Sequence, residues 1–123
     1  MQLSDRQVGN TLVLKPTGRL DHATTEAFRT ALQPHLDRCK DAGVVVLDMS
    51  GVEYISSVGL RVLMLAAKQV RTQGGAIAVA ALQPVVREIF EISRFNLVIP
   101  SFDDVRQALA QLSPSALGSY PAP

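Results

Sequence analysis

The pattern of apolar and polar residues changes sharply in the middle of the chain. Residues 44–49 form an apolar run whose only charged member is Asp48, which is typical of a strand covered on both faces in a parallel sheet. Ser50 and Gly51 supply a turn, and from Ser57 onward the apolar residues follow the period of a helix. The stripe that should pack on the sheet consists of Gly59, Val62, Leu63, Ala66, Ala67 and Val70. The pattern therefore predicts a buried strand followed by an amphipathic helix that begins at Ser57.

The N-terminal part of the chain predicts a hairpin and a first helix. The pair Gly9-Asn10 separates residues 2–8 from residues 11–15, and such a pair favours an antiparallel hairpin. Asp21 can cap the helix that follows. The buried stripe of this helix is expected to contain Ala27, Phe28, Ala31 and Leu32.

The C-terminal half continues the alternation of strands and helices. Residues 76–82 predict an apolar strand, Pro84 marks a helix start, and residues 97–99 predict a short last strand. The inward residues of the last two helices are expected to be Val86, Ile89 and Phe90, and then Phe102, Val105, Leu109 and Leu112. The order ββαβαβαβα describes a single α/β domain over residues 1–112, with a mixed, mainly parallel sheet, an antiparallel edge strand and about four helices. Residues 113–123 are rich in Pro, Ser and Ala, and we expect a disordered tail there.

Composition narrows the classes of function. The chain has 123 residues, 47% of them apolar, which suffices for one core, and its net charge is +1. A charge so near zero leaves no electrostatic footprint for nucleic acid, so no direct DNA or RNA binding is expected. Cys39 is the only cysteine, which excludes an intramolecular disulfide and fits a reducing compartment. No apolar run approaches the roughly 20 residues that span a membrane, and the N-terminus lacks a signal-peptide profile, so we expect a cytoplasmic protein without membrane insertion.

Ser57 is the residue of greatest chemical interest. At a helix start its hydroxyl lies beside unpaired backbone N–H groups and the positive end of the helix dipole, where a phosphate of roughly −1.5 to −2 charges would be stabilised. The position therefore predicts a switch operated by phosphorylation. The alternative is that Ser57 or Ser56 only caps the helix, which stabilises it by about 1 kcal/mol and carries no further function.

These residues resemble the anti-sigma factor antagonists, the bacterial group within the sulphate-transporter and anti-sigma-antagonist (STAS) domain family. The family pattern is an apolar strand ending Asp-Leu-Ser-Gly-Val, an aromatic-apolar pair, Asp-Ser-Ser/Thr/Ala-Gly-Leu and an amphipathic helix. The matching residues are Asp48-Met49-Ser50-Gly51-Val52, Tyr54-Ile55 and Ser56-Ser57-Val58-Gly59-Leu60. Further matches are Thr17-Gly18-Arg19-Leu20-Asp21, Gly74-Gly75 and Pro84-Val85-Val86-Arg87, so the resemblance covers about residues 12–112.

The resemblance implies an anti-sigma factor antagonist in a partner-switching pathway that regulates transcription. Ser57 falls on the serine that is phosphorylated in the family, with Ser56 as the alternative. The unphosphorylated protein is expected to bind an anti-sigma factor that is a serine-protein kinase of the histidine-kinase-like ATPase fold, and phosphorylation is expected to end that binding. Related domains also serve as soluble accessory subunits of lipid-transport ABC systems, which gives the alternative function.

Two residues depart from the family pattern. The Asp that precedes the phosphorylated serine is Ser56 in this chain, so a negative charge beside the modified hydroxyl is missing. The acidic residue of the Thr-Gly-Glu-Leu-Asp motif is Arg19, which reverses a charge near the expected partner surface. The reversed charge at Arg19 is expected to affect which member of that partner class is bound.

A partner surface is predicted on the outward face of the central helix. Counting 100° per residue places Ser57, Arg61, Met64, Leu65, Lys68, Arg71 and Thr72 on that face. Met64 and Leu65 form a small apolar centre among basic residues, which suits a protein interface. The predicted partner-binding residues are Asp21, Ser56, Ser57, Arg61, Met64, Leu65 and Lys68. Alternatively, Met64 and Leu65 pack under a loop or against a second copy of the chain in a homodimer.

An enzymatic function is not expected. A hydrolase would need a general base beside Ser57, yet the chain has no Gly-x-Ser-x-Gly motif and its only histidines are His22 and His35. His22 follows Asp21, which leaves a Ser-His pair open, although a solvated histidine is more common at a helix start. Two histidines and one cysteine without ligand spacing predict no metal site, and no cofactor is expected.

Overall fold

A computed structural model describes residues 2–39 and 43–120 of the chain. Its strands over these ranges are β1 (Gln2–Val8), β2 (Thr11–Leu20), β3 (Val44–Asp48), β4 (Gly51–Ile55), β5 (Ala76–Ala80) and β6 (Ser101–Phe102). The helices are α1 (Thr25–Asp37), α2 (Ser57–Thr72), α3 (Pro84–Ile92), α4 (Val105–Leu112) and α5 (Pro114–Ser119), with a 3-10 turn, η1, at Phe95–Leu97. The strand order is β1-β2-β3-β5-β6, and β4 pairs with β2. β1 is antiparallel to β2 and the other pairings are parallel, which confirms the predicted mixed sheet with an antiparallel edge.

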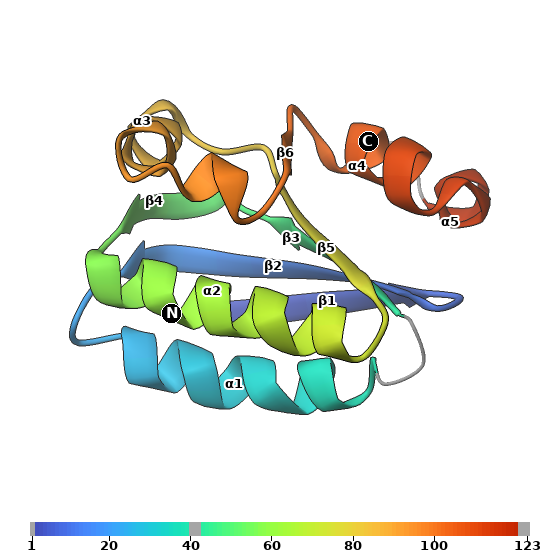
Figure 1. The fold of residues 1–123 in the computed structure, drawn as a ribbon, viewed down its shortest axis with the longest axis horizontal. Helices are drawn as coiled ribbons and strands as arrows, with labels where there is room; N and C mark the ends of the chain where they lie inside the picture. Colours follow the sequence, from blue (N-terminus) through green and yellow to red (C-terminus); the bar gives the residue numbers. More distant parts are fainter. Residues whose placement is uncertain (1, 40–42, 121–123) are drawn as a thin grey trace.

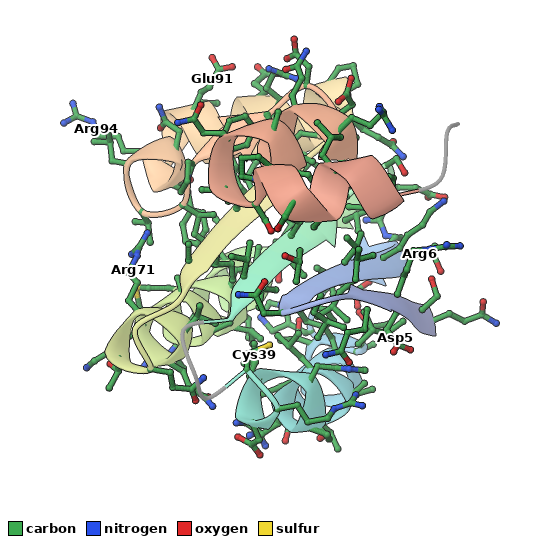
Figure 2. All side chains as sticks on the ribbon, turned by 90° about the vertical axis from the view of Figure 1, so that its right-hand side faces the viewer. Asp5, Arg6, Cys39, Arg71, Glu91 and Arg94 are labelled. Atoms are coloured by element: carbon green, nitrogen blue, oxygen red, sulfur yellow. The ribbon has the colours of Figure 1, made fainter. Side chains whose placement is uncertain are left out.

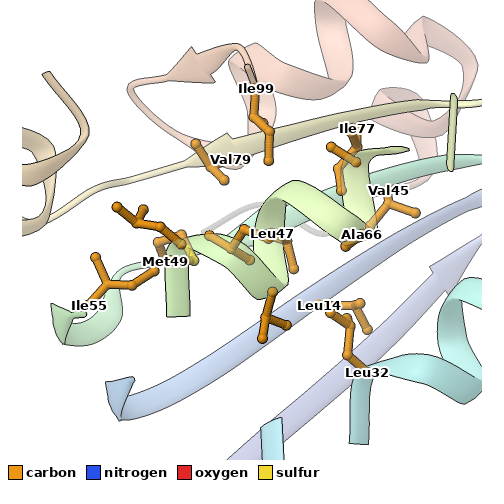
Figure 3. Packing of buried hydrophobic residues seen from close by; sticks show 14 of the residues in the cluster. Leu14, Leu32, Val45, Leu47, Met49, Ile55, Ala66, Ile77, Val79 and Ile99 are labelled. Atoms are coloured by element: carbon orange, nitrogen blue, oxygen red, sulfur yellow. The ribbon is translucent and has the colours of Figure 1, made fainter. Parts of the chain in front are cut away.

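The helices cover both faces of this sheet. Figure 1 shows α1 and α2 side by side on one face and α4 and α5 on the other, while α3 lies close to β4. The main core lies between the sheet, α1, α2 and α3 and includes Leu14, Leu32, Leu47, Met49 and Ile99, all nearly or fully buried (Figure 3). A second apolar cluster joins the other face of the sheet to α4 and α5. No helix among the described residues is both long enough and apolar enough to cross a membrane.

The segment around the central strand follows the prediction closely. β3 occupies the apolar run, α2 begins at Ser57, and every residue of its predicted inner stripe is buried. β4 was not predicted, because this short strand is defined by its pairing with β2 and not by a pattern of its own. β2 is long enough to pair with β3 over residues 11–14 and then with β4 over residues 17–20. Both strands therefore line one edge of β2, and β4 ends directly beneath the start of α2.

Three predictions of local structure are wrong. In α1 the buried residues are Thr25, Phe28, Leu32 and Leu36, whereas Ala27 and Ala31 are exposed. Methyl side chains have little apolar area to bury, so the larger residues set the rotation of the helix. Residues 97–99 are not a strand, because η1 follows α3 there and the last strand forms later, at β6. β5 ends at Ala80, since Ala81 has a left-handed φ of 60°.

The C-terminal segment also differs from the prediction. Residues 114–119 form α5 in place of a disordered tail, and Ala116 is buried against the second core cluster. The Thr11 hydroxyl donates a buried hydrogen bond of 2.8 Å to Ser113 Oγ, which ties the start of α5 to β2. The tail prediction for residues 121–123 concerns residues outside the described part of the chain.

Candidate functional site

Ser56 and Ser57 form the junction between β4 and α2. Ser56 caps the helix, because its Oγ accepts a hydrogen bond of 3.2 Å from the backbone N–H of Gly59. The Ser56 N–H donates to the carbonyl of Leu20 at 2.8 Å, and Ser56 is only 7% exposed. Ser57 is the first helical residue and is exposed. The two adjacent serines therefore have different environments, one buried and hydrogen-bonded and the other open to solvent.

Two glycines allow close packing on β2, one at the start of β4 and one in the first turn of α2. A Cβ on Gly59 would approach Ile55 Cγ1 to 2.9 Å and the Cβ and carbonyl oxygen of Leu20 to 3.2 Å each. A Cβ on Gly51 would approach Thr17 Cγ2 to 2.6 Å. Gly59 thus lets the first turn of α2 rest on the ends of β2 and β4, and Gly51 lets the start of β4 lie close to β2.

A polar cluster lies at the same end of β2. Arg19 and Tyr54 are paired in the β2–β4 register, and the guanidinium carbon of Arg19 lies 4.7 Å from the centroid of the Tyr54 ring. Arg19 Nε is also 3.8 Å from Asp21 Oδ2. Stacking of this kind contributes about 0.5–1 kcal/mol at exposed sites. The residue that reverses the family charge is therefore held in place by an aromatic ring and a carboxylate.

Asp21 organises the turn between β2 and α1. Its Oδ1 accepts hydrogen bonds from the N–H groups of Ala23 at 3.0 Å and Thr24 at 3.2 Å, while the helix cap itself is Thr24. The prediction that Asp21 caps α1 is thus wrong by three residues. Desolvation raises the pKa of the Asp21 carboxyl, but the hydrogen bonds from Ala23 and Thr24 and the charge of Arg19 outweigh it and hold the pKa below its usual value.

The outward face of α2 carries the rest of the predicted partner surface. Arg61 and Lys68 are exposed, and Met64 and Leu65 keep 40% and 47% of their surface accessible. The guanidinium of Arg71 donates to the carbonyl of Val98, so this arginine connects α2 to the segment after α3 (Figure 2). The predicted outer face of the helix is therefore exposed.

The structure brings only part of the predicted set together. The end of β2, including Asp21, meets the start of α2 through the Leu20 carbonyl, whereas Met64, Leu65 and Lys68 lie two to three turns further along the helix. His22 is exposed, and no hydrogen bond joins it to Ser57 in the described part of the chain, so no Ser-His pair is formed. The prediction missed the Arg19–Tyr54 stack, whose two residues are brought together by a strand pairing that the sequence pattern did not reveal.

A groove lies beside Leu65, between α1 and α2. It measures about 110 Å³, and its apolar walls come from Leu32, Leu36, Val62, Leu65 and Ala66. Gln33 Nε2 donates to Gln69 Oε1 at 2.9 Å across the two helices, and Gln73 Nε2 donates to the carbonyls of Leu36 and Cys39. These amide contacts hold α1 and α2 together. Cys39 itself is buried between α1 and the sheet, and burial raises the pKa of its thiol (Figure 2).

Known proteins share this architecture. The model of the STAS domain family matches residues 2–108. BtrV of Bordetella bronchiseptica, provisionally described as an anti-sigma factor antagonist, is 37% identical over 117 residues, covering 95% of this chain and 98% of BtrV.

Solved structures agree at the level of the fold. An anti-sigma factor antagonist from Mycobacterium paratuberculosis has a TM-score of 0.79 and 22% identity, and the match covers 90% of this chain and 92% of that one. The anti-sigma factor antagonist SpoIIAA of Bacillus has been solved in two forms. Its unphosphorylated form gives a TM-score of 0.73 with 16% identity over 92% of this chain and 97% of SpoIIAA, and its phosphorylated form gives 0.65 with 15% identity over 89% and 98%.

Proposed function

The chain belongs to the STAS domain family, and on that premise we propose that it is an anti-sigma factor antagonist controlled by phosphorylation of Ser57. In this proposal the unphosphorylated protein binds an anti-sigma factor that is a serine-protein kinase of the histidine-kinase-like ATPase fold. Phosphorylation by that kinase releases the complex. The chain acts as a cytoplasmic binding protein and not as an enzyme. The observation that carries the proposal is an exposed serine at the first position of a helix that is fixed rigidly to the sheet.

Accessibility supports Ser57 over Ser56 as the modified residue. The Ser56 hydroxyl accepts the Gly59 N–H, and Ser56 is 7% exposed, so a phosphate there would have to break the cap and enter the core. Ser57 has no such constraint, because it is exposed and only its backbone belongs to the helix. A kinase can reach its hydroxyl without unfolding the junction.

Electrostatics supports a stable phosphoserine at this position. The first turn of α2 contains no acidic residue, so the positive end of the helix dipole is not neutralised by a side chain. A phosphate on Ser57 would fall within that field, where negative charge is stabilised by typically 0.3–1 kcal/mol per charge at an exposed site. The modification would therefore add charge to the partner surface without melting the helix.

The experiment uses serine kinases of the histidine-kinase-like ATPase fold from the source organism, each purified and mixed with the full chain and ATP. Peptide mass spectrometry should locate one added phosphate on Ser57. The Ser57→Ala variant should bind the kinase and stay unmodified, and Ser57→Asp should bind more weakly. Ser101→Ala, which alters an exposed serine on β6, is the matched control and should behave as the unaltered chain does.

Two results would overturn this proposal. Phosphate on Ser56, with none on Ser57, would show that accessibility does not select the residue. Stable binding to a transporter ATPase, with no binding to any of the kinases, would make the chain an accessory subunit of a transport system instead.

A further inference from the structure

The outer face of α2 carries charge of a single sign. The helix contains Arg61, Lys68 and Arg71 and no Asp or Glu along its whole length. Arg71 donates a hydrogen bond to the carbonyl of Val98. Neither Arg61 nor Lys68 has a carboxylate partner within residues 2–39 and 43–120. Two exposed cations on one helix face, with no anion to balance them, are available to a ligand from outside.

Apolar surface lies on both sides of these cations. Val58, Met64 and Leu65 are 37%, 40% and 47% exposed. At 100° per residue, Met64 lies on one side of the line through Arg61 and Lys68, and Val58 and Leu65 lie on the other. Leu65 also forms the lip of the 110 Å³ groove between α1 and α2, whose walls are mainly apolar. The face thus offers an apolar contact area with positive charge at its middle.

We infer that this face binds a protein whose matching surface is apolar and carries Asp or Glu side chains opposite Arg61 and Lys68. The inference rests on the proposed function and deepens it, because it names the chemistry of the partner surface. Exposed cations attract such a partner at a distance and reject one that is basic, since like charges brought together at an interface cost several kcal/mol. The groove beside Leu65 is large enough to receive one aliphatic side chain of that partner.

A membrane surface fits the same face less well. Recognition of anionic lipid usually needs clusters of four to eight Lys or Arg, whereas this face offers two unpaired cations. Interfacial helices also insert large side chains, often Trp or Phe, and α2 has no aromatic residue. The observations therefore favour a protein.

A phosphate on Ser57 would act on the same positive charges. Arg61 lies one turn after Ser57, on the same side of the helix. A phosphate on Ser57 brings roughly −1.5 to −2 charges, enough to neutralise or reverse the charge of Arg61 beside it, whereas Lys68 lies about 16 Å from Ser57 along the helix. The modification would thus weaken the attraction on which an acidic partner depends, mainly at Arg61, and no change of fold is needed.

The test measures binding of the full chain to three kinds of probe. These are the purified kinases, purified transporter ATPase subunits, and vesicles of phosphatidylcholine mixed with the anionic lipid phosphatidylserine. The variants are Arg61→Glu and Lys68→Glu, with Arg106→Glu as the matched control, since Arg106 is exposed on α4 on the opposite face of the sheet. Affinity is measured at low and high salt, because attraction between exposed charges is screened by salt.

We expect each reversal on α2 to weaken the protein complex roughly tenfold at low salt and to reduce its salt dependence, while Arg106→Glu changes affinity less than twofold. A compensating Glu→Lys change on the partner should restore binding of the α2 variants. Equal affinity of all variants for a kinase that phosphorylates Ser57 would overturn the inference and leave the proposed function intact. Binding to a transporter ATPase that depends on Arg61 and Lys68 would overturn the proposed function and leave the inference about α2 intact. Binding to the vesicles instead of a protein would overturn the inference, and binding to none of the probes would overturn both.

Discussion

The substitution Gly59→Ala tests whether the start of α2 is pressed against the sheet as closely as the structure shows. The new methyl group would lie 2.9 Å from Ile55 Cγ1 and 3.2 Å from both the Cβ and the carbonyl oxygen of Leu20. Ile55 and Leu20 are 1% and 0% exposed, so neither can move aside into solvent. The helix must therefore shift away from β2, which stretches the bond between Ser56 N–H and the Leu20 carbonyl.

Two opposing effects set the size of the change in stability. Replacing glycine by alanine inside a helix stabilises it by about 1 kcal/mol. Overpacking in a closed site costs typically 1–3 kcal/mol, and weakening one hydrogen bond adds about 0.5–1.5 kcal/mol. The steric cost exceeds the gain, so we expect a net loss of roughly 1–2 kcal/mol in the free energy of unfolding.

Urea denaturation followed by circular dichroism measures this loss directly. Gly118→Ala is the matched control, because a Cβ at Gly118 in α5 meets nothing within 4 Å. It should leave stability unchanged or raise it by up to about 1 kcal/mol. A Gly59→Ala protein as stable as the Gly118→Ala protein would refute the close contact between α2 and β2, and with it the rigid placement of Ser57.

Three further predictions concern the stability of α2, of its contact with α1 and of the turn between β2 and α1. Ser56→Ala should lower the free energy of unfolding by about 1 kcal/mol through loss of the helix cap, whereas Ser57→Ala should change it by less than about 0.5 kcal/mol; equal effects in urea denaturation would contradict the assignment of the cap. Gln73→Ala should cost about 1–2 kcal/mol by the same assay, since its amide satisfies two carbonyls at the end of α1, and no loss would mean that water replaces them fully. Asp21→Asn should be less stable than the unaltered chain above about pH 4, because the carboxyl pKa is lowered in the folded protein and its ionised form stabilises the fold. That difference should vanish as the pH falls through the folded pKa, and a difference independent of pH in urea titrations would exclude the charge as its cause.

The fold was predictable where local pattern and tertiary environment agree. The apolar run of β3 and the helical stripe of α2 are each long enough to define one element, and both are found as predicted. β4 was not predictable in this way, because its residues become a strand only by pairing with the distal half of β2. α5 was missed for a similar reason. Its composition favours disorder, and its order comes from the buried contact between Ser113 and Thr11 and from Ala116 in the second core cluster.

In the candidate site, too, the features set by local pattern were predictable and those set by tertiary contacts were not. Helical periodicity in the sequence is enough to predict that Ser57 lies at a helix start and that the outward residues of α2 are exposed. Those exposed residues are Arg61, Met64, Leu65 and Lys68. Spacing could not decide which serine caps the helix, because both residue positions and types suit the role. The structure decides it through one hydrogen bond from Gly59 and through the burial of Ser56.

The two departures from the family pattern change the charge of the site while its geometry is kept. Serine caps a helix about as well as aspartate, so Ser56 preserves the junction and removes one negative charge beside Ser57. Arg19 takes the place of an acidic residue and is held by Tyr54 and Asp21, which changes the local charge by two units in the same direction. Both changes add to the positive character that Arg61 and Lys68 give to α2. A partner that binds its antagonist through basic residues would be repelled here, so these departures favour the acidic partner surface inferred from α2.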